Sequence, residues 1–194
     1  MTVNSMKRQE NKMANRFILN ETSYFGAGAR ENLVPELKGR GLKKVMFVTD
    51  KVLLECGVAT KVTAELDKAG IAYEIYSDIK ANPTVTNVND GVAKFKEIGA
   101  DSLVAVGGGS VMDTAKAVGI IIANPEFADV VSLEGVADTK NKSVPLIALP
   151  TTSGTAAEVT INYVITDEAN KKKMVCVDPK DIPVVAIVDS DLMM

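Results

Sequence analysis

The sequence contains no histidine among its 194 residues. Histidine is the side chain that most often binds catalytic transition metals and that most often transfers protons near neutral pH. A Ser-His-Asp triad, a histidine-bound zinc ion and a histidine proton relay are therefore excluded within this chain. The two cysteines, Cys56 and Cys176, lie far apart and outside any metal-type spacing. This usage indicates free thiols, buried or half-buried, in a reducing cytoplasm.

Long apolar runs and a strong excess of charge of either sign are also missing. The longest apolar run covers about seven residues around Gly119 to Ala123, far short of the roughly 20 that span a bilayer. A net charge of −3 gives no electrostatic footprint for nucleic acid or an anionic membrane. Residues 1–12 are polar and lack the apolar segment of a secretory signal, so we expect a disordered leader there. Residues 13–194 are long enough for one folded domain.

Three consecutive glycines, Gly107 to Gly109, follow an apolar run from Leu103 to Val106 that predicts a buried strand. Because glycine has no Cβ, the backbone there can adopt positive φ and can approach another molecule closely. A helical pattern follows, and the free N–H groups at a helix start favour an anion such as pyrophosphate. Ser110 and Asp113 have the spacing of an N-terminal capping pair, which predicts a well-defined helix start.

The glycine stretch differs from two common nucleotide motifs. It is not Gly-x-Gly-x-x-Gly, and no Gly-Lys-Ser/Thr follows it, which excludes a mononucleotide P-loop. Taken alone, the stretch is equally consistent with a turn selected only for tight packing of a strand against a helix, since short glycine patterns recur by chance.

Asp50 follows a second apolar run, Val45 to Val48, which predicts a central parallel strand buried on both faces. Ligands of open α/β sheets bind at the carboxyl ends of the strands. A carboxylate there can accept hydrogen bonds from ribose and repel a 2′-phosphate, which favours NAD over NADP. The alternative is that Asp50 caps the next short helix, because aspartate is among the best N-cap residues.

Two further loops follow predicted strands. Asn82 precedes Pro83, which biases it toward an extended backbone, and its amide either reaches a ligand over the strand ends or only forms a turn. The loop from Thr151 to Thr155 is rich in hydroxyl groups. Its hydroxyls and N–H groups either bind phosphate or ribose or cap their own backbone.

Strand and helix patterns alternate along the chain with short connections. This alternation predicts an α/β fold with a doubly wound, mostly parallel, Rossmann-like sheet. A hairpin of residues 159–166 and 174–177, joined by a charged turn, is expected beside it. The predicted strands of the sheet lie near residues 45–48, 71–76, 103–106, 144–150 and 183–188, with an edge strand or hairpin in 17–26, and two of the helices end at Gly70 and Gly99.

Residues 13–194 resemble the N-terminal half of the group III, iron-dependent alcohol dehydrogenases, and among these the lactaldehyde reductases, also called 1,2-propanediol oxidoreductases. The pattern Gly-Gly-Gly-Ser-x-x-Asp-x-x-Lys, which ends here at Lys116, is one part of this resemblance. The other matching segments are Asn20-Glu21-Thr22 with Phe25-Gly26, Val48-Thr49-Asp50-Lys51, Asn82-Pro83-Thr84, Pro150-Thr151-Thr152 with Gly154-Thr155, and 158–168.

The resemblance implies NAD as the cofactor and a dehydroquinate synthase-like version of the α/β fold. It implies binding residues along the whole length of the cofactor: Asp50 at the adenosine ribose, Gly108, Gly109 and Ser110 at the pyrophosphate with Asn82 nearby, Thr151, Thr152 and Thr160 along the groove, and Asn162 and Lys173 at the nicotinamide side.

The resemblance also implies chemistry that needs more than this chain. The family transfers hydride between NAD(H) and a small alcohol or aldehyde, with iron as the Lewis acid, and forms homodimers or larger assemblies. Its iron is held by one aspartate and three histidines of an α-helical C-terminal domain, which should begin shortly after residue 194. Asp189 and Asp191 do not match that motif, so we expect no metal ligand here. We expect a truncated chain that binds NAD weakly, catalyses nothing alone and exposes an apolar patch.

Other interpretations stay open. The chain is alternatively a nucleotide-binding module without activity, or one subunit of a split enzyme whose partner supplies the metal domain. A purely structural α/β domain is a third possibility. The glycerol dehydrogenases and dehydroquinate synthases share the fold, but residues 158–168 argue against that assignment.

Overall fold

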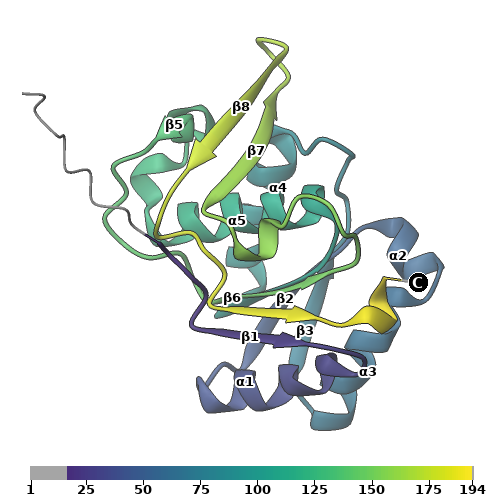
Figure 1. The fold of residues 1–194 in the computed structure, drawn as a ribbon. Coiled ribbons are helices and arrows are strands. Elements are labelled where there is room, and N and C mark those ends of the chain that lie inside the picture. The colour runs from purple at the N-terminus through teal and green to yellow at the C-terminus, as the bar shows by residue number, and fades with distance from the viewer. Residues whose placement is uncertain (1–16, 194) are drawn as a thin grey trace, which may run out of the picture.

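The computed structural model describes residues 17–193, and the leader predicted for residues 1–12 lies outside them. Figure 1 shows a twisted sheet with helices on both faces and a hairpin that projects beyond it. Within residues 17–193, none of the helices combines the length and the apolar character needed to cross a membrane.

The main sheet has six strands, and every pairing in it is parallel. Its spatial order is β1-β9-β6-β4-β2-β3, so the chain passes from β2 to β3 at one edge and then crosses back through β4, β6 and β9 to lie beside β1 at the other edge. This confirms the predicted doubly wound α/β fold. The strands are β1 (Thr22–Phe25), β2 (Lys44–Val48), β3 (Ala72–Tyr76), β4 (Ser102–Gly107), β6 (Leu146–Pro150) and β9 (Val185–Val188).

Helices cover both faces of the sheet, which explains its continuous apolar runs. Val45 and Phe47 of β2 face one core, whereas Met46 and Val48 face the other, as the two-residue pleat requires. One core packs against α1 (Leu33–Gly39), α2 (Lys51–Glu55) and α3 (Val58–Ala69), and the other against α4 (Val85–Ile98) and α5 (Gly109–Ala123). Both predicted glycine stops are present, because Gly70 and Gly99 cap α3 and α4 with positive φ.

A second, three-stranded sheet has the order β5-β8-β7 and packs on α5. β7 (Asn162–Asp167) and β8 (Lys172–Val177) form the predicted antiparallel hairpin. The short strand β5 (Gly135–Val136) was not predicted, because two residues carry no periodicity. Within residues 17–193, five 3-10 helices join the elements: η1 (Ala29–Asn32), η2 (Pro125–Phe127), η3 (Val130–Leu133), η4 (Ala157–Val159) and η5 (Ser190–Leu192).

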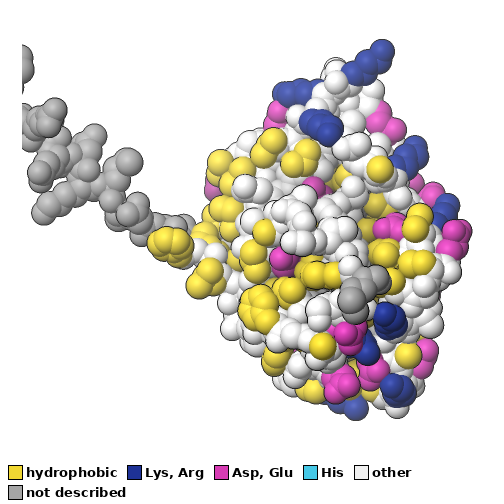
Figure 2. All heavy atoms as spheres, turned by 45° about the vertical axis from the view of Figure 1, so that its right-hand side comes forward, with side chains coloured by type: hydrophobic (Ala, Val, Ile, Leu, Met, Phe, Trp, Pro, Cys, Tyr) yellow, Lys and Arg dark blue, Asp and Glu magenta, His cyan; other side chains and the backbone are white. Residues whose placement is uncertain are grey.

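Some apolar and thiol side chains reach the surface. Phe17, Leu19 and Phe25 are 88%, 74% and 71% exposed. Figure 2 shows hydrophobic side chains gathered across the middle of the face that is turned to the viewer. Both cysteines are free thiols as predicted, although Cys56 is exposed and only Cys176 is buried.

Candidate cofactor site

The carboxyl ends of β2, β4 and β6 lie next to one another in the main sheet. Asp50 follows β2, Gly108 follows β4 and Thr151 follows β6, so three predicted loops converge at one edge. A cavity of about 480 Å³ opens between them. It is lined by Asp50, Lys51, Val52, Leu53, Ile79, Lys80, Ala81, Gly108, Gly109, Ser110, Val111, Thr151 and Thr152.

The three glycines are required by close contacts rather than by positive φ, which none of them adopts. A Cβ at Gly107 would lie 2.5 Å from Val111 Cγ2, and one at Gly109 would lie 2.8 Å from Thr155 Cγ2. The packing interpretation therefore holds for these two. A Cβ at Gly108 would lie 3.3 Å from Thr152 Oγ1, in the wall of the cavity. The loop is thus packed on one side and open to the cavity on the other.

The predicted capping pair of Ser110 and Asp113 is wrong. The N-cap of α5 is Gly108, which carries no side chain, so Ser110 is already the second helical residue. Ser110 Oγ accepts instead from the N–H of Asn82 at 3.2 Å, and Asp113 Oδ2 accepts from the N–H of Val164 at 3.1 Å. Among residues 17–193 no side chain caps this helix, so the N–H groups of Gly109 and Ser110, two residues in the cavity wall, have no side-chain partner there.

Asp50 is the N-cap of α2, which confirms the alternative interpretation of this residue. Its Oδ1 accepts from the N–H of Leu53 at 2.9 Å, with an extended backbone typical of a cap. The cap does not remove Asp50 from the cavity wall. A carboxylate has lone pairs beyond the one used here, so the two interpretations of Asp50 are compatible.

Asn82 has a left-handed backbone with φ of 58°, so the extended conformation predicted from Pro83 is wrong. Asparagine tolerates this region better than most residues. The turn directs the N–H of Asn82 at Ser110, and Asn82 Oδ1 accepts from Lys173 Nζ at 2.8 Å. Lys173 comes from β8, so this contact joins the hairpin to the glycine loop.

A second cavity of about 320 Å³ lies under this contact. It shares Gly109 and Ser110 with the first cavity, so the two together follow the start of α5. Its remaining walls are Asn82, Pro83, Asp113, Thr155, Val164, Thr166 and Lys173.

Asp113 is the titratable group in the wall of this second cavity that sequence reasoning missed as a site residue. Burial raises the pKa of its carboxyl to about 6, against the hydrogen bond from Val164 and the charge of Lys116, which both lower it. The spacing of Asp113 could have indicated this role, because a residue one turn after the glycine loop faces the same side of the helix as the loop.

Thr160 and Asn162 lie apart from the two cavities. They line a hollow of about 260 Å³ with Phe17 and Ile18, and their backbone carbonyls accept from Lys116 Nζ. The structure therefore brings eight of the predicted cofactor residues to one groove and leaves two on a neighbouring surface.

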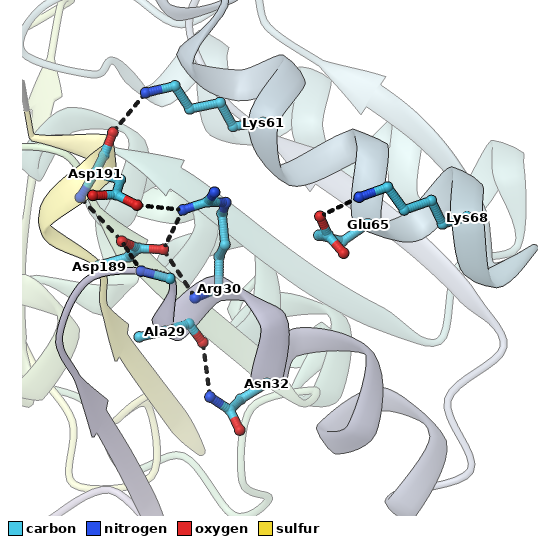
Figure 3. A network of polar contacts seen from close by, with 9 residues as sticks. Ala29, Arg30, Asn32, Lys61, Glu65, Lys68, Asp189 and Asp191 are labelled. Carbon is cyan, nitrogen blue, oxygen red and sulfur yellow. Dashed lines mark hydrogen bonds and ion pairs between the residues drawn. The ribbon is translucent and has the colours of Figure 1, made fainter.

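Asp189 and Asp191 lie at the end of β9 in a network with Arg30 (Figure 3). Asp189 Oδ1 accepts from the N–H groups of Gly28 and Asp191, both at 3.0 Å. Its Oδ2 accepts from Arg30 through N–H at 3.0 Å and Nη1 at 2.9 Å. Four donors occupy this carboxylate, so it has no lone pair left for a metal. Within residues 17–193 no three side chains of ligand type are grouped as a metal site.

Comparisons with known proteins point to one family. The family model described as "Iron-containing alcohol dehydrogenase" matches residues 20–190. Lactaldehyde reductase of Escherichia coli K12 is 59% identical over 181 residues, which are 93% of this chain and 47% of that protein. NAD-dependent methanol dehydrogenase of Bacillus methanolicus is 40% identical over 91% of this chain and 46% of its own length. This chain therefore spans about half the length of these relatives.

Solved structures agree in fold. A crystal structure of 1,3-propanediol oxidoreductase superimposes with a TM-score of 0.89 at 35% identity, over 93% of this chain and 47% of the other. Sulfoacetaldehyde reductase from Bifidobacterium kashiwanohense, solved in complex with NAD⁺, gives 0.81 at 32% identity over the same shares. The family match covers most of the chain, and this chain belongs to the iron-containing alcohol dehydrogenases.

Proposed function

We propose that this chain binds NAD(H) along the carboxyl edge of its main sheet. It would be the cofactor-binding part of an oxidoreductase that acts on a small alcohol or aldehyde of the lactaldehyde and 1,2-propanediol type. The observation that carries the proposal is the pair of cavities that meet at Gly109 and Ser110, at the uncapped start of α5. An elongated dinucleotide with a central diphosphate fits that arrangement, with the diphosphate at the helix start.

The charges around the first cavity support a phosphate-bearing ligand. Lys51 and Lys80 line it together with the free N–H groups of α5, and Thr151 and Thr152 add hydroxyl donors. Both lysines have a surface carboxylate beside them, because Lys51 Nζ lies 2.7 Å from Asp78 Oδ1 and Lys80 Nζ lies 3.9 Å from Glu168 Oε1. A diphosphate therefore meets donors from several directions.

Asp50 supports NAD over NADP. Its carboxylate lines the cavity at the carboxyl end of β2, where an adenosine ribose would lie if the diphosphate occupies the start of α5. A 2′-phosphate placed there would be repelled by a like charge.

The nicotinamide half would then extend toward the hairpin, over the second cavity. Asn82, Lys173 and Asp113 offer hydrogen-bonding groups there, and Thr160 and Asn162 lie beyond them. A carboxyl whose pKa lies at about 6 can donate to an amide oxygen when protonated and accept from an amide N–H when ionised.

Iron does not fit the residues that this chain supplies. The sequence has no histidine, and the four donors on Asp189 leave that carboxylate unavailable. The Lewis-acid activation of a substrate oxygen that iron provides in catalysis would need ligands from outside the described residues. We propose that the isolated chain binds the cofactor in a cytoplasmic setting and catalyses no turnover, and that the complete assembly is at least a dimer.

Calorimetric titration of the 194-residue chain with NADH tests this proposal, with NADPH as the competitor for specificity. We expect saturable heat with NADH and weaker heat with NADPH. Gly108→Val should abolish the NADH signal, because its side chain fills the cavity wall beside Thr152. Gly39→Ala is the matched control, since a Cβ there meets nothing within 4 Å and the residue lies far from the site on α1. The absence of any heat with millimolar NADH would overturn the proposal.

A further inference from the structure

Lys116 is a fully buried lysine in the middle of α5. Its Nζ donates to the carbonyl oxygens of Thr160 at 2.6 Å and Asn162 at 3.0 Å, and to Thr160 Oγ1 at 3.3 Å. An ammonium group has three N–H donors, so these contacts use all of them. The proposed cofactor groove does not include Lys116.

The acceptors of Lys116 lie at Thr160, just before β7, and at Asn162, the first residue of that strand. In the part of the chain that the structure describes, β7 pairs with β8 along one edge and with Thr84 only at Thr166 on the other. Along that second edge, Asp113 accepts from the N–H of Val164 and Lys116 donates to the carbonyl of Asn162. Two side chains of α5, three residues apart, therefore replace a strand partner for β7.

A buried ammonium group is an energetically costly donor for these carbonyls, because it must be removed from water. Burial lowers the pKa of Lys116, and the carboxylates of Asp181, Asp113 and Glu158 oppose that shift. A neutral donor would satisfy a backbone carbonyl without the desolvation of an ammonium group. What the ammonium adds is three donors on one atom, which fix two neighbouring carbonyls and a hydroxyl relative to a single point of the helix.

We propose that Lys116 is a positioning residue that sets the Thr160–Asn162 segment at a fixed distance from the phosphate-binding start of α5. Gly109 begins the helix, and Lys116 lies roughly 10 Å further along it at 1.5 Å per residue. One rigid helix thus connects the site for the diphosphate with the segment that faces the nicotinamide half. This inference rests on the proposed function, because it assumes that NAD(H) extends from the glycine loop toward β7.

The test compares NADH with ADP-ribose, which shares the adenosine diphosphate part but lacks nicotinamide. Lys116→Met keeps an apolar chain of similar length and removes the donors. We expect its affinity for NADH to fall by about tenfold, as for the loss of about one hydrogen bond between the cofactor and a displaced Thr160–Asn162 segment, and its affinity for ADP-ribose to change by less than about twofold. The fluorescence of bound NADH should also lose the emission shift that reports a fixed nicotinamide environment. The control is Lys96→Met, at an exposed position of α4.

A double variant separates positioning from folding. Removing Lys116 alone leaves Asp181 buried without its compensating charge, so the single variant can lose stability. Lys116→Met combined with Asp181→Asn removes both groups and should recover the stability while the NADH affinity stays low. Recovery of NADH binding together with stability would overturn the proposal, as would equal loss of NADH and ADP-ribose affinity in both variants.

The outcomes also distinguish this inference from the proposed function. If the unmodified chain binds neither NADH nor ADP-ribose, the proposed function fails and the role of Lys116 fails with it. If the unmodified chain binds both ligands and Lys116→Met binds both equally well, only the inference about Lys116 is overturned.

Discussion

Two fully buried carboxylates flank β9, and they differ in the hydrogen bonds that they accept. Asp189, at the end of β9, accepts four hydrogen bonds from three residues. Asp181, before β9, has neither carboxylate oxygen hydrogen-bonded within the described residues, and the hydroxyl of Ser143 is likewise unpartnered. Burial raises the pKa of both groups, but the hydrogen bonds from Arg30 and its neighbours outweigh burial at Asp189 and hold its pKa below the usual range.

At Asp181 the effect of burial on the pKa is the larger one. The positive charge of Lys116 lowers its pKa but does not cancel the burial, so the pKa lies well above the usual range. The comparison shows that burial alone does not determine whether a carboxyl is ionised. The donors that the fold supplies decide it, which makes Asp189 a fixed structural anion and Asp181 a group that can hold a proton.

The same substitution at both positions tests the comparison. Asp189→Asn should lower the free energy of unfolding by about 3 kcal/mol. It removes the negative charge opposite Arg30, and it places the NH₂ group of the amide against N–H groups that need an acceptor. Urea unfolding at pH 7 measures this loss. An effect under about 1 kcal/mol would contradict the claim that four donors make Asp189 a structural anion. Asp191→Asn is the control, since that side chain is 38% exposed and should matter little.

Arg30→Met gives an intermediate case. It removes one of the four donors to Asp189 and leaves the three backbone N–H groups in place. We expect a loss of about 1.5–2 kcal/mol in the free energy of unfolding, as for one hydrogen bond to a charged group. Urea unfolding of Lys61→Met provides the matched control, because the Lys61 ammonium is exposed and donates to the backbone carbonyl of Asp191 rather than to a carboxylate. A loss as large as that of Asp189→Asn would mean that Arg30 alone holds the carboxylate.

The sequence predicted the framework of this molecule well. Continuous apolar runs such as Val45–Val48 identify parallel strands, and Gly70 and Gly99 identify helix ends, because burial and backbone strain act locally on those residues. The position of most cofactor residues at strand ends follows from the same pattern. Membership of the family came from ordered motifs spread over the whole chain, which periodicity alone does not supply.

What the sequence did not predict depends on contacts between distant segments. Ser110 and Asp113 have the spacing of a cap, but their partners are Asn82 and Val164, which lie in other elements. The left-handed turn at Asn82 likewise occurs where its side chain contacts Lys173, a residue from a distant segment. The burial of Lys116 against β7 is of the same kind, because a lysine on a helix is usually exposed.

Asp181→Asn should have the smallest effect of the three substitutions, within about 1 kcal/mol at pH 5, because asparagine resembles the protonated carboxyl in shape. Its effect should change with pH in a direction opposite to that of Asp189. A folded-state pKa above the unfolded one means that the folded chain holds the extra proton, so stability falls as the pH rises above the unfolded value. Asp181→Asn removes this dependence and should therefore become more favourable, relative to the unmodified chain, between pH 5 and 8.

Asp189 gives the opposite sign in the same measurement. Its folded pKa lies below the unfolded one, so its stabilisation is present above the unfolded value and is lost as the pH falls through the folded value. Urea unfolding at a series of pH values should show Asp189→Asn approaching the unmodified chain in acid and Asp181→Asn departing from it toward neutral pH. If both variants followed the same pH trend, the hydrogen-bond donors would not be what separates the two carboxylates.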